Sequence, residues 1–436
     1  MEASVIISAV GIVLAVLFVV WFTYKGYSPM ILAPIGGVII CVTSGLDLTT
    51  GMISDFAASY GNMSSSMLFI YLLGTMFAAV MTKSEAAYSI AEWLAKIFGQ
   101  KFAAFTVMMM AGIMMIGGMS VGTYMIVFPI GMVLFSRANI SKSLMVGCII
   151  GGCWTWGNCF PFSPSNHNNI AMQILGTTPS AGLIPGLAAG LFLILANGFY
   201  LEWQGRRWAR QGRGFSSWEE LPEDTTEAKA KYPPVWRAWI PIIAVLVLYN
   251  AVGLHIAFCL VIGTLLEIAL EFHKFLPREW FQTCQQGILD GVMPVCIIAI
   301  MSGLGGVVSQ TPAYFAMLDW LETTTINPYI ISFLGAALCA FCLGSATSAL
   351  GIMLPAVLPL FQSYVAAGYD MGVLHRLAVV GSLSLDSLPH NGSIIAMAEQ
   401  FNLTMKDTYF PVFIVSVVNV FLAGIVGTAV AMLGFT

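Results

Sequence analysis

The sequence predicts an all-α protein that crosses a membrane many times and is built from two inverted repeats. Three observations predict this fold. Of the 436 residues, 58% are hydrophobic and only 9% are charged, whereas soluble domains carry about 25% charged residues. Uncharged stretches long enough to cross a hydrocarbon core of about 30 Å recur along the chain, and the two halves share polar blocks at a constant spacing. A water-soluble enzyme, a nucleic-acid-binding protein and a disordered protein are excluded, and the expected surrounding is a lipid bilayer.

Each predicted repeat contains five transmembrane spans, one of them discontinuous, and one re-entrant hairpin. The hairpins are expected because two uncharged stretches are long enough for two passes but are interrupted by glycine and serine. The discontinuous spans are expected because two further stretches contain polar, proline-bearing interruptions. The first repeat covers 1–201, with its hairpin at 102–136 and its broken helix at 141–178; the second covers 236–436, with its hairpin at 326–366 and its broken helix at 372–400.

The distribution of Lys and Arg predicts the orientation, because these residues accumulate on the cytoplasmic side of membrane proteins. With the N-terminus outside and each broken helix crossing once, every one of the 17 Lys and Arg residues except Arg376 falls inside. The hydrophilic segment 202–235 is then a cytoplasmic linker. Since each repeat crosses an odd number of times, the second repeat is inverted relative to the first, and both termini lie outside.

Matching blocks in the two halves lie 225 to 227 residues apart. The block from Gly118 to Pro129 corresponds to that from Gly344 to Pro355, and the block 164–166 corresponds to 389–391. Inverted repeats with discontinuous helices are typical of secondary transporters, which hold their substrate near the membrane midplane where the helices break.

The four interruptions are the predicted substrate site. Non-helical backbone at membrane depth needs polar partners, and all four interruptions carry polar side chains but no Lys or Arg. An anion would therefore be held by helix N-termini, freed backbone amides, hydroxyls and side-chain amides, which suits one small carboxylate. The alternative for each polar residue is a purely structural bond to a helix carbonyl or cap. The predicted substrate-binding residues are Ser120, Thr123, Ser165, Asn166, His167, Asn168, Ser345, Thr347, Ser348, Ser387, His390 and Asn391.

Asp386 is the only carboxylate within the four interruptions. An ionisable group inside the membrane is costly and marks a functional site by default. We therefore predict that Asp386, together with His390, carries the coupling ion. The alternative role for Asp386 is that of a helix cap. No organic cofactor is expected.

Three motifs of the second half resemble the gluconate permease (GntP-type) family of the ion transporter superfamily. They are Leu343-Gly-Ser-Ala-Thr347, Ser384-Leu-Asp-Ser-Leu-Pro-His-Asn-Gly392 and Phe401-Asn-Leu-Thr404. The resemblance implies cation-coupled uptake of small organic anions, with proton symport of gluconate as the family's type activity, across the inner membrane of a bacterium. It also implies a homodimer with elevator-type movement. By the same resemblance, the hairpin tip at 344–347 and the breaks around Asn166 and Asn391 bind substrate or ion.

The first break departs from the gluconate-type pattern, which is rich in His and Pro, since it reads Phe162-Ser-Pro-Ser-Asn-His-Asn-Asn169. The motif at 384–392 is similar to that of members that carry short monocarboxylates, including hydroxy and keto acids. The Ser- and Asn-rich breaks also resemble sodium sites elsewhere in the superfamily. A proton is favoured as the coupling ion, and the sodium alternative would place the ion near Ser120, Asn166, Thr347 and Asn391.

The leading prediction is thus a cation-coupled symporter for a small carboxylate, and not an enzyme. A sodium/proton antiporter is the first alternative, since Asp386 and His390 could serve it without an organic substrate. An intramembrane hydrolase is the second, because Ser387, His390 and Asp386 supply the three residue types of a catalytic triad.

Overall fold

The computed structural model describes residues 3–98, 100–116, 123–215 and 232–435, and these residues form helices and connecting loops without a strand. The all-α prediction is therefore confirmed for this part of the chain. Several helices are also long and apolar enough to cross a membrane. These membrane-span candidates are Ala3–Tyr24, Thr50–Lys83, Leu183–Arg210, Pro277–Val308, Ala346–Ala366 and Met405–Met432.

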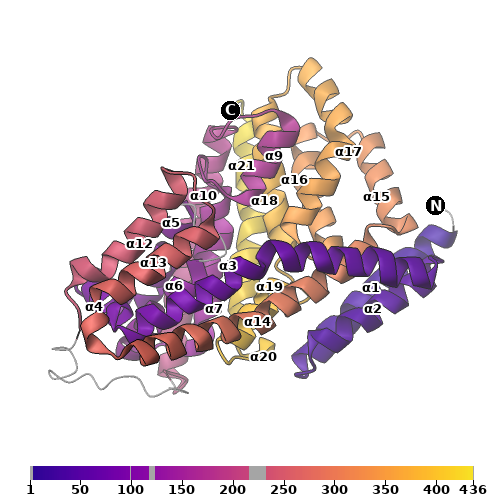
Figure 1. Cartoon of the computed structure of the whole chain (residues 1–436). Coiled ribbons are helices and arrows are strands. Elements are labelled where there is room, and N and C mark those ends of the chain that lie inside the picture. The colour runs from indigo at the N-terminus through magenta and orange to yellow at the C-terminus, as the bar shows by residue number, and fades with distance from the viewer. Residues whose placement is uncertain (1–2, 99, 117–122, 216–231, 436) are drawn as a thin grey trace. The chain divides into compact units, whose positions relative to one another are not determined.

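The first half of the chain begins with a pair of apolar helices, α1 and α2, which pack side by side (Figure 1). Ser28 caps α2 by accepting a hydrogen bond from the Met30 amide, and Gly45 ends it in the left-handed conformation with φ 67°. Further on, α5 and α6 lie where the sequence predicts the first hairpin, whose tip at 117–122 is outside the described residues, and the helix predicted to be broken is interrupted between Cys159 and Asn166. The elements are α1 (Ala3–Tyr24), α2 (Pro29–Ser44), a π-helical turn (Thr50–Phe56), α3 (Ala57–Lys83), α4 (Ala86–Phe98), α5 (Ala103–Ile116), α6 (Thr123–Ala138), α7 (Met145–Ile150), a second π-helical stretch (Gly151–Trp156), α8 (Gly157–Cys159), α9 (Asn166–Leu175) and α10 (Leu183–Arg210).

The second half repeats this order of helices. A pair of apolar helices comes first, then a long helix and a short one, then two helices that meet at Gly344, and then a helix that breaks between Leu385 and Gly392. The elements are α12 (Val235–Asn250), α13 (Ile256–Leu270), α14 (Pro277–Val308), α15 (Pro312–Thr323), α16 (Pro328–Leu343), α17 (Ala346–Ala366), α18 (Met371–Leu385), α19 (Gly392–Gln400), α20 (Met405–Val412), a π-helical stretch (Phe413–Val418) and α21 (Asn419–Met432).

Three pairs of helix starts in the two halves share one spacing. Helix α7 begins at Met145 and α18 begins at Met371, 226 residues later; the starts of α4 and α15, and those of α9 and α19, are separated by the same number. This value lies within the spacing of the repeated sequence blocks. The polar, proline-bearing breaks therefore recur at equivalent positions in the order of helices, while the inverted orientation of the second half stays a prediction.

The chain folds into two compact units, and each takes helices from both halves of the sequence. The second break, the tip between α16 and α17, and the first break after Asn158 all belong to the same unit. Thr123, at the start of α6, belongs to the other. Unit 1 comprises Met1–Ser65, Asn158–Ile194 and Pro294–Thr436, and unit 2 comprises Ser66–Gly157 and Leu195–Met293.

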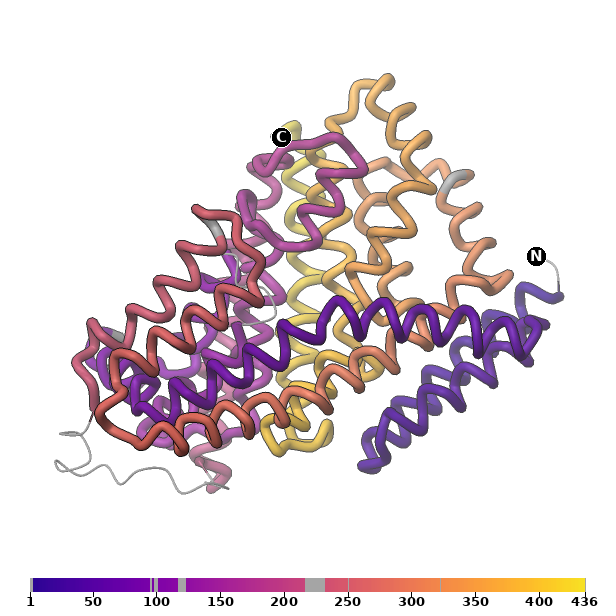
Figure 2. Tube along the Cα trace, viewed as in Figure 1, coloured from indigo at the N-terminus to yellow at the C-terminus, as the bar shows by residue number. Residues whose placement is uncertain are grey.

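In unit 1, α18 packs against α16, α17, α21 and α9 (Figures 1 and 2). Small residues permit this close packing. A Cβ on Gly381 of α18 would lie 2.1 Å from the Phe333 carbonyl oxygen, and a Cβ on Gly424 of α21 would lie 2.0 Å from the Phe333 ring. Because α9 also packs against α17, the half-helix of the first break is held by the hairpin and broken helix of the second half.

In unit 2, ion pairs connect elements that the sequence assigns to the cytoplasmic side. Lys274 Nζ donates to the Ser84 carbonyl at 2.9 Å and lies 3.3 Å from Glu271 and 3.6 Å from Glu85. Arg137 of α6 forms an ion pair with Glu92 of α4. The pair α12 and α13 packs together, and α12 also contacts α4.

Candidate functional site

The second break, between α18 and α19, is held in shape by Asn391. Its Oδ1 accepts hydrogen bonds from the backbone amides of Ser393 at 2.8 Å and Ile394 at 3.2 Å, which makes it the N-cap of α19. Its Nδ2 donates to the Asp386 carbonyl at 2.9 Å. Asn391 therefore satisfies backbone groups on both sides of the break, which the interrupted helices leave without intrahelical partners.

The Asp386 side chain connects this break to the hairpin tip. Its Oδ1 accepts a hydrogen bond from Ser387 Oγ at 2.8 Å, and the backbone amide of Ala346, the first residue of α17, also donates to it. Among the described residues, no Lys or Arg forms an ion pair with Asp386. The carboxylate is thus stabilised by the N-terminus of α17, where the helix dipole favours negative charge.

The hairpin tip itself packs directly against the second break. Helix α16 ends at Gly344, which has φ 61°, and Ser345 caps α17 by accepting from the Ser348 amide at 3.3 Å. A Cβ on Gly344 would lie 2.8 Å from Cδ2 of His390. His390 Nε2 lies 3.1 Å from the Phe341 carbonyl oxygen, and must donate to it. His390 thus caps the last turn of α16, and its predicted role in binding stays a prediction.

The first break meets the same hairpin tip from the other side. Ser165 caps α9 by accepting from the Asn168 amide at 3.3 Å, and its Oγ donates to the Asn158 carbonyl at 3.4 Å. In the first turn of α9, His167 Nε2 lies 3.4 Å from Thr347 Oγ1 of α17. The first residue of α9, Asn166, is exposed.

Three half-helix N-termini therefore meet within unit 1. The starts of α9 and α17 are joined by His167 and Thr347, and the start of α17 lies against the second break, from which α19 begins. Each N-terminus carries a partial positive charge of about half an elementary charge, and some of its amides have no intrahelical acceptor. Partial charges of this sign favour a small anion.

Sequence reasoning missed Arg376. The residue was expected on the outer side as an isolated cation, but it is 0% exposed on α18. Its Nη1 donates to Asn168 Oδ1 at 2.7 Å and to the Cys159 carbonyl at 3.1 Å, and its Nε donates to the Ala181 carbonyl at 3.0 Å. The expectation of interruptions without a cation must therefore be corrected, because a fixed positive charge from another helix is bonded to the first break.

Asn168 is engaged on every hydrogen-bonding atom of its side chain. Its Nδ2 donates to the carbonyl oxygens of Asn158 at 3.1 Å and Ser163 at 2.9 Å, while its Oδ1 accepts from Arg376. The amide thus ties both sides of the first break to α18. The contacts of Asn168 account for its place in the break without a ligand.

The predicted residues of the first hairpin, Ser120 and Thr123, lie outside unit 1 or outside the described residues. Ser120 lies outside the described residues. Thr123 is buried in unit 2, and its Oγ1 has no hydrogen-bond partner among the described residues. In the first break, Asn158 Oδ1 and Ser163 Oγ are buried without a described partner in the same way. Buried polar atoms are nearly always bonded, so these atoms are available to a water molecule, an ion or a substrate.

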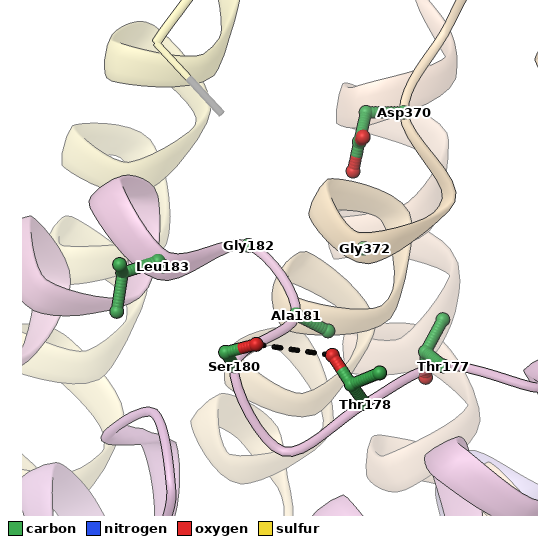
Figure 3. A pocket seen from close by; sticks show the side chains of 8 residues that line it. All are labelled: Thr177, Thr178, Ser180, Ala181, Gly182, Leu183, Asp370 and Gly372. Atoms are coloured by element: carbon green, nitrogen blue, oxygen red, sulfur yellow. Dashed lines mark hydrogen bonds between the residues drawn. The ribbon is translucent and has the colours of Figure 1, made fainter.

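An open cavity of about 350 Å³ lies where the loop between α9 and α10 meets the start of α18 (Figure 3). Thr178 and Ser180, whose hydroxyls are 3.0 Å apart, line it together with Asp370, the N-cap of α18. Gly182, which also lines the cavity, separates it from Arg376, since a Cβ on Gly182 would lie 2.6 Å from the arginine Cβ. The cavity therefore lies close to the buried arginine.

Long apolar helices, polar helix breaks and converging half-helix N-termini define a membrane transporter. The chain belongs to the GntP permease family, since the family model described as GntP family permease matches residues 3–434. The family expected from the three motifs is thereby confirmed, and with it a transporter and not an enzyme. Among the described residues, His390 Nδ1 has no hydrogen-bond partner and its Nε2 donates to the Phe341 carbonyl, so Ser387 and His390 are not bonded to each other.

Relatives of the chain span nearly its full length. It is 23% identical over 466 residues to the uncharacterized transporter YxjC of Bacillus subtilis (strain 168), and the alignment covers 96% of this chain and 96% of that protein. It is 24% identical over 399 residues to the gluconate permease of Zymomonas mobilis, covering 85% of this chain and 87% of that protein. Among solved structures, the YdaH transporter of Alcanivorax borkumensis matches with a TM-score of 0.45 and 11% identity, over 94% of this chain and 99% of that one.

Proposed function

We propose that the protein is a secondary active transporter that couples a cation, with a proton favoured, to the symport of a small organic carboxylate such as a short monocarboxylate or a hydroxy or keto acid. The observation that carries the proposal is the meeting of three half-helix N-termini in unit 1, with Asp386 hydrogen-bonded to one of them. This arrangement supports the proposal, because symport of an acid needs an anion site and a proton acceptor, and we assign these roles to the helix N-termini and to Asp386.

The substrate carboxylate is proposed to bind at the start of α9. The Ser165 cap engages the Asn168 amide, and helix geometry leaves the amides of Asn166 and His167 without an intrahelical acceptor. The Thr347 hydroxyl lies beside His167 and adds a donor. Amides and hydroxyls at a helix N-terminus bind carboxylates well. A relative named gluconate permease supports an organic anion as the substrate class.

Coupling is proposed to follow from the place that Asp386 occupies. The ionised carboxylate sets its own negative charge against the N-terminus of α17, where it competes with an incoming anion. A proton on Asp386 removes that charge, so the N-terminus becomes available to the substrate. Two other titratable groups are near: Tyr409, whose hydroxyl donates to the Ser387 carbonyl at 3.1 Å, and His390 at the end of the break. Proton and carboxylate then bind together, because either alone leaves an unbalanced charge.

The proposed topology has inverted repeats, with both termini outside and 202–235 in the cytoplasm of a bacterial cell. Contacts inside each unit support it, because they join segments assigned to the same side. Lys274 and Ser84 are assigned inside and are bonded. The Thr177 hydroxyl, in the loop after α9, lies 2.6 Å from His375 Nδ1 near the start of α18, and both residues are assigned to the outer side. A homodimer with elevator-type movement is part of the proposal and rests on the family resemblance.

Uptake by proteoliposomes tests the proposal. A panel of short carboxylates, including lactate, pyruvate and gluconate, is presented with an imposed proton gradient. We expect the wild-type protein to accumulate at least one acid. Asp386→Asn should reduce this accumulation at least tenfold, while its rate of carboxylate exchange should stay within about threefold of the wild-type rate. Asp370→Asn is the control, because this exposed carboxylate also caps a helix and asparagine caps equally well. Equal loss of accumulation and exchange in Asp386→Asn would contradict its coupling role.

Sodium coupling is the second candidate. Asn158 Oδ1 and Ser163 Oγ are buried oxygens without described partners, and such oxygens suit a small hard cation. An imposed sodium gradient at constant pH separates the two ions in the same assay. Accumulation driven by sodium alone would replace the proton proposal, and sodium-evoked currents that need no carboxylate would favour a sodium/proton antiporter.

A further inference from the structure

We infer that Arg376 is a positioning residue whose fixed positive charge makes the first break selective for an anion. The inference rests on the proposed function and adds a determinant of substrate class. It starts from one contact: the guanidinium is bonded to Asn168, the third residue of α9, and is thereby held against the first turn of that helix.

The position of the guanidinium is fixed by the Asn168 side chain and by backbone carbonyls of two further segments. Besides Asn168, it donates to the Cys159 carbonyl at 3.1 Å, before the break, and to the Ala181 carbonyl at 3.0 Å, in the loop after α9. Glycines make room for the side chain, since a Cβ on Gly182 or Gly186 would lie 2.6 or 2.9 Å from its carbon atoms. The charge is therefore rigidly placed beside the break.

The charge is also uncompensated. All described acceptors of Arg376 are neutral oxygens, and among the described residues no carboxylate forms an ion pair with it. A buried charge acts over longer distances than an exposed one, because the surrounding protein screens it less than water does. Its sign is the same as that of the α9 N-terminus. Both therefore favour a carboxylate near Asn166 and His167 and disfavour a cation there.

A purely structural role is the competing explanation, since the same bonds hold the break together. Substitutions at Cys159 can separate the effect of the Arg376 charge from that of its hydrogen bonds. This side chain is 0% exposed and interacts electrostatically with Arg376. Cys159→Asp places a carboxylate beside the guanidinium, whereas Cys159→Asn places a neutral group of the same shape there. Neither substitution removes a hydrogen bond that Arg376 makes.

The experiment measures the KM and maximal rate of exchange for a carboxylate that the wild type transports. We expect Cys159→Asp to raise the KM at least tenfold above that of Cys159→Asn, with maximal rates within about threefold of each other. The uncharged amide of the same acid serves as a weak competitor, and its inhibition constant should not change between the two variants. A structural defect would lower the rate and would act on both ligands alike.

A second pair of variants covers the case in which Cys159→Asp does not fold. Arg376→Lys keeps the charge and should stay within about fivefold of the wild-type KM, while Arg376→Gln removes it and should raise the KM at least tenfold. Equal KM values within each pair of folded variants would overturn the inference and leave the proposed function intact. Absence of carboxylate exchange in the wild-type protein would instead end the proposed function, and the inference with it.

Discussion

Several polar residues that were predicted to bind substrate are used to hold the breaks in shape. Ser165, Ser345 and Asn391 are N-caps, and Asn168 ties the first break to Arg376. From the sequence, a capping side chain and a ligating one look alike, because both are small polar residues beside a proline or glycine. The structure leaves His167, Thr347 and exposed Asn166 as the better-placed candidates for ligand contact.

Asn166 provides the prediction at this scale. Its side chain is exposed at the first position of α9, and no described hydrogen bond uses it as a cap. We expect Asn166→Ala to raise the KM for the transported carboxylate about threefold to tenfold, because one hydrogen bond contributes a net free energy of about 1 kcal/mol. Kinetics of exchange measure this, and thermal unfolding of the purified variant should be unchanged. An unaltered KM would remove Asn166 from the site.

Arg376 shows why the site could be predicted only in part. The sequence correctly places the second hairpin tip and the two broken helices, because glycine, proline and polar residues interrupt long uncharged stretches; the first tip, at 117–122, lies outside the described residues. It cannot show that a cation on α18 reaches a break some 200 positions earlier, since that contact depends on how α9 packs against α18. Two signals were present: Arg376 is the one cation left on the outer side, and glycines recur at 182, 186 and 190 with the spacing of close helix packing.

At the scale of helices, the breaks are stabilised by their caps as well as by packing. Helix α19 has only 9 residues, and isolated helices shorter than about 12 residues are marginal in water. Its start depends on Asn391, which bonds the amides of Ser393 and Ile394 and the Asp386 carbonyl. The cap therefore also fixes the backbone that positions the Asp386 carboxylate.

Asn391 provides the prediction at the element scale. We expect Asn391→Ala to destabilise the protein by about 1 kcal/mol, the typical loss for an N-cap, and to reduce proton-driven accumulation. Asn391→Ser should recover most of the stability, because serine is a good N-cap, but not the bond to the Asp386 carbonyl. Thermal unfolding and uptake are measured on both variants. Full stability of Asn391→Ala would show that packing alone holds α19.

For the whole molecule, the order of helices can be predicted from the sequence, whereas their grouping into two units is seen only in the structure. Three pairs of helix starts repeat 226 residues apart, within the spacing of the matching blocks. The two compact units, however, combine helices from both halves. Side-chain contacts between distant segments decide that grouping, and no pattern within one stretch of sequence records them.

The predicted orientation is tested by labelling single cysteines with an impermeant maleimide in a variant without native cysteines. Ala367, between α17 and α18, and Gln211, after α10, are both exposed. We expect Ala367→Cys to react in intact cells and Gln211→Cys to react only after the membrane is permeabilised, because the cationic segments are assigned to the cytoplasm. The reverse pattern would invert the topology.

Helix α18 contains Arg376, and Asp386 directly follows the last residue of this helix; neither side chain has an ion-pair partner among the described residues. At 1.5 Å per residue they are about 15 Å apart along the axis. In the empty protein these two groups contribute one charge of each sign. With a proton on Asp386 and one bound monocarboxylate, the charges of Arg376, Asp386 and the substrate again sum to zero. Each transport cycle should therefore be electroneutral, so a potassium diffusion potential set with valinomycin should leave the uptake rate unchanged. Uptake that accelerates with interior-negative voltage would require a second cation.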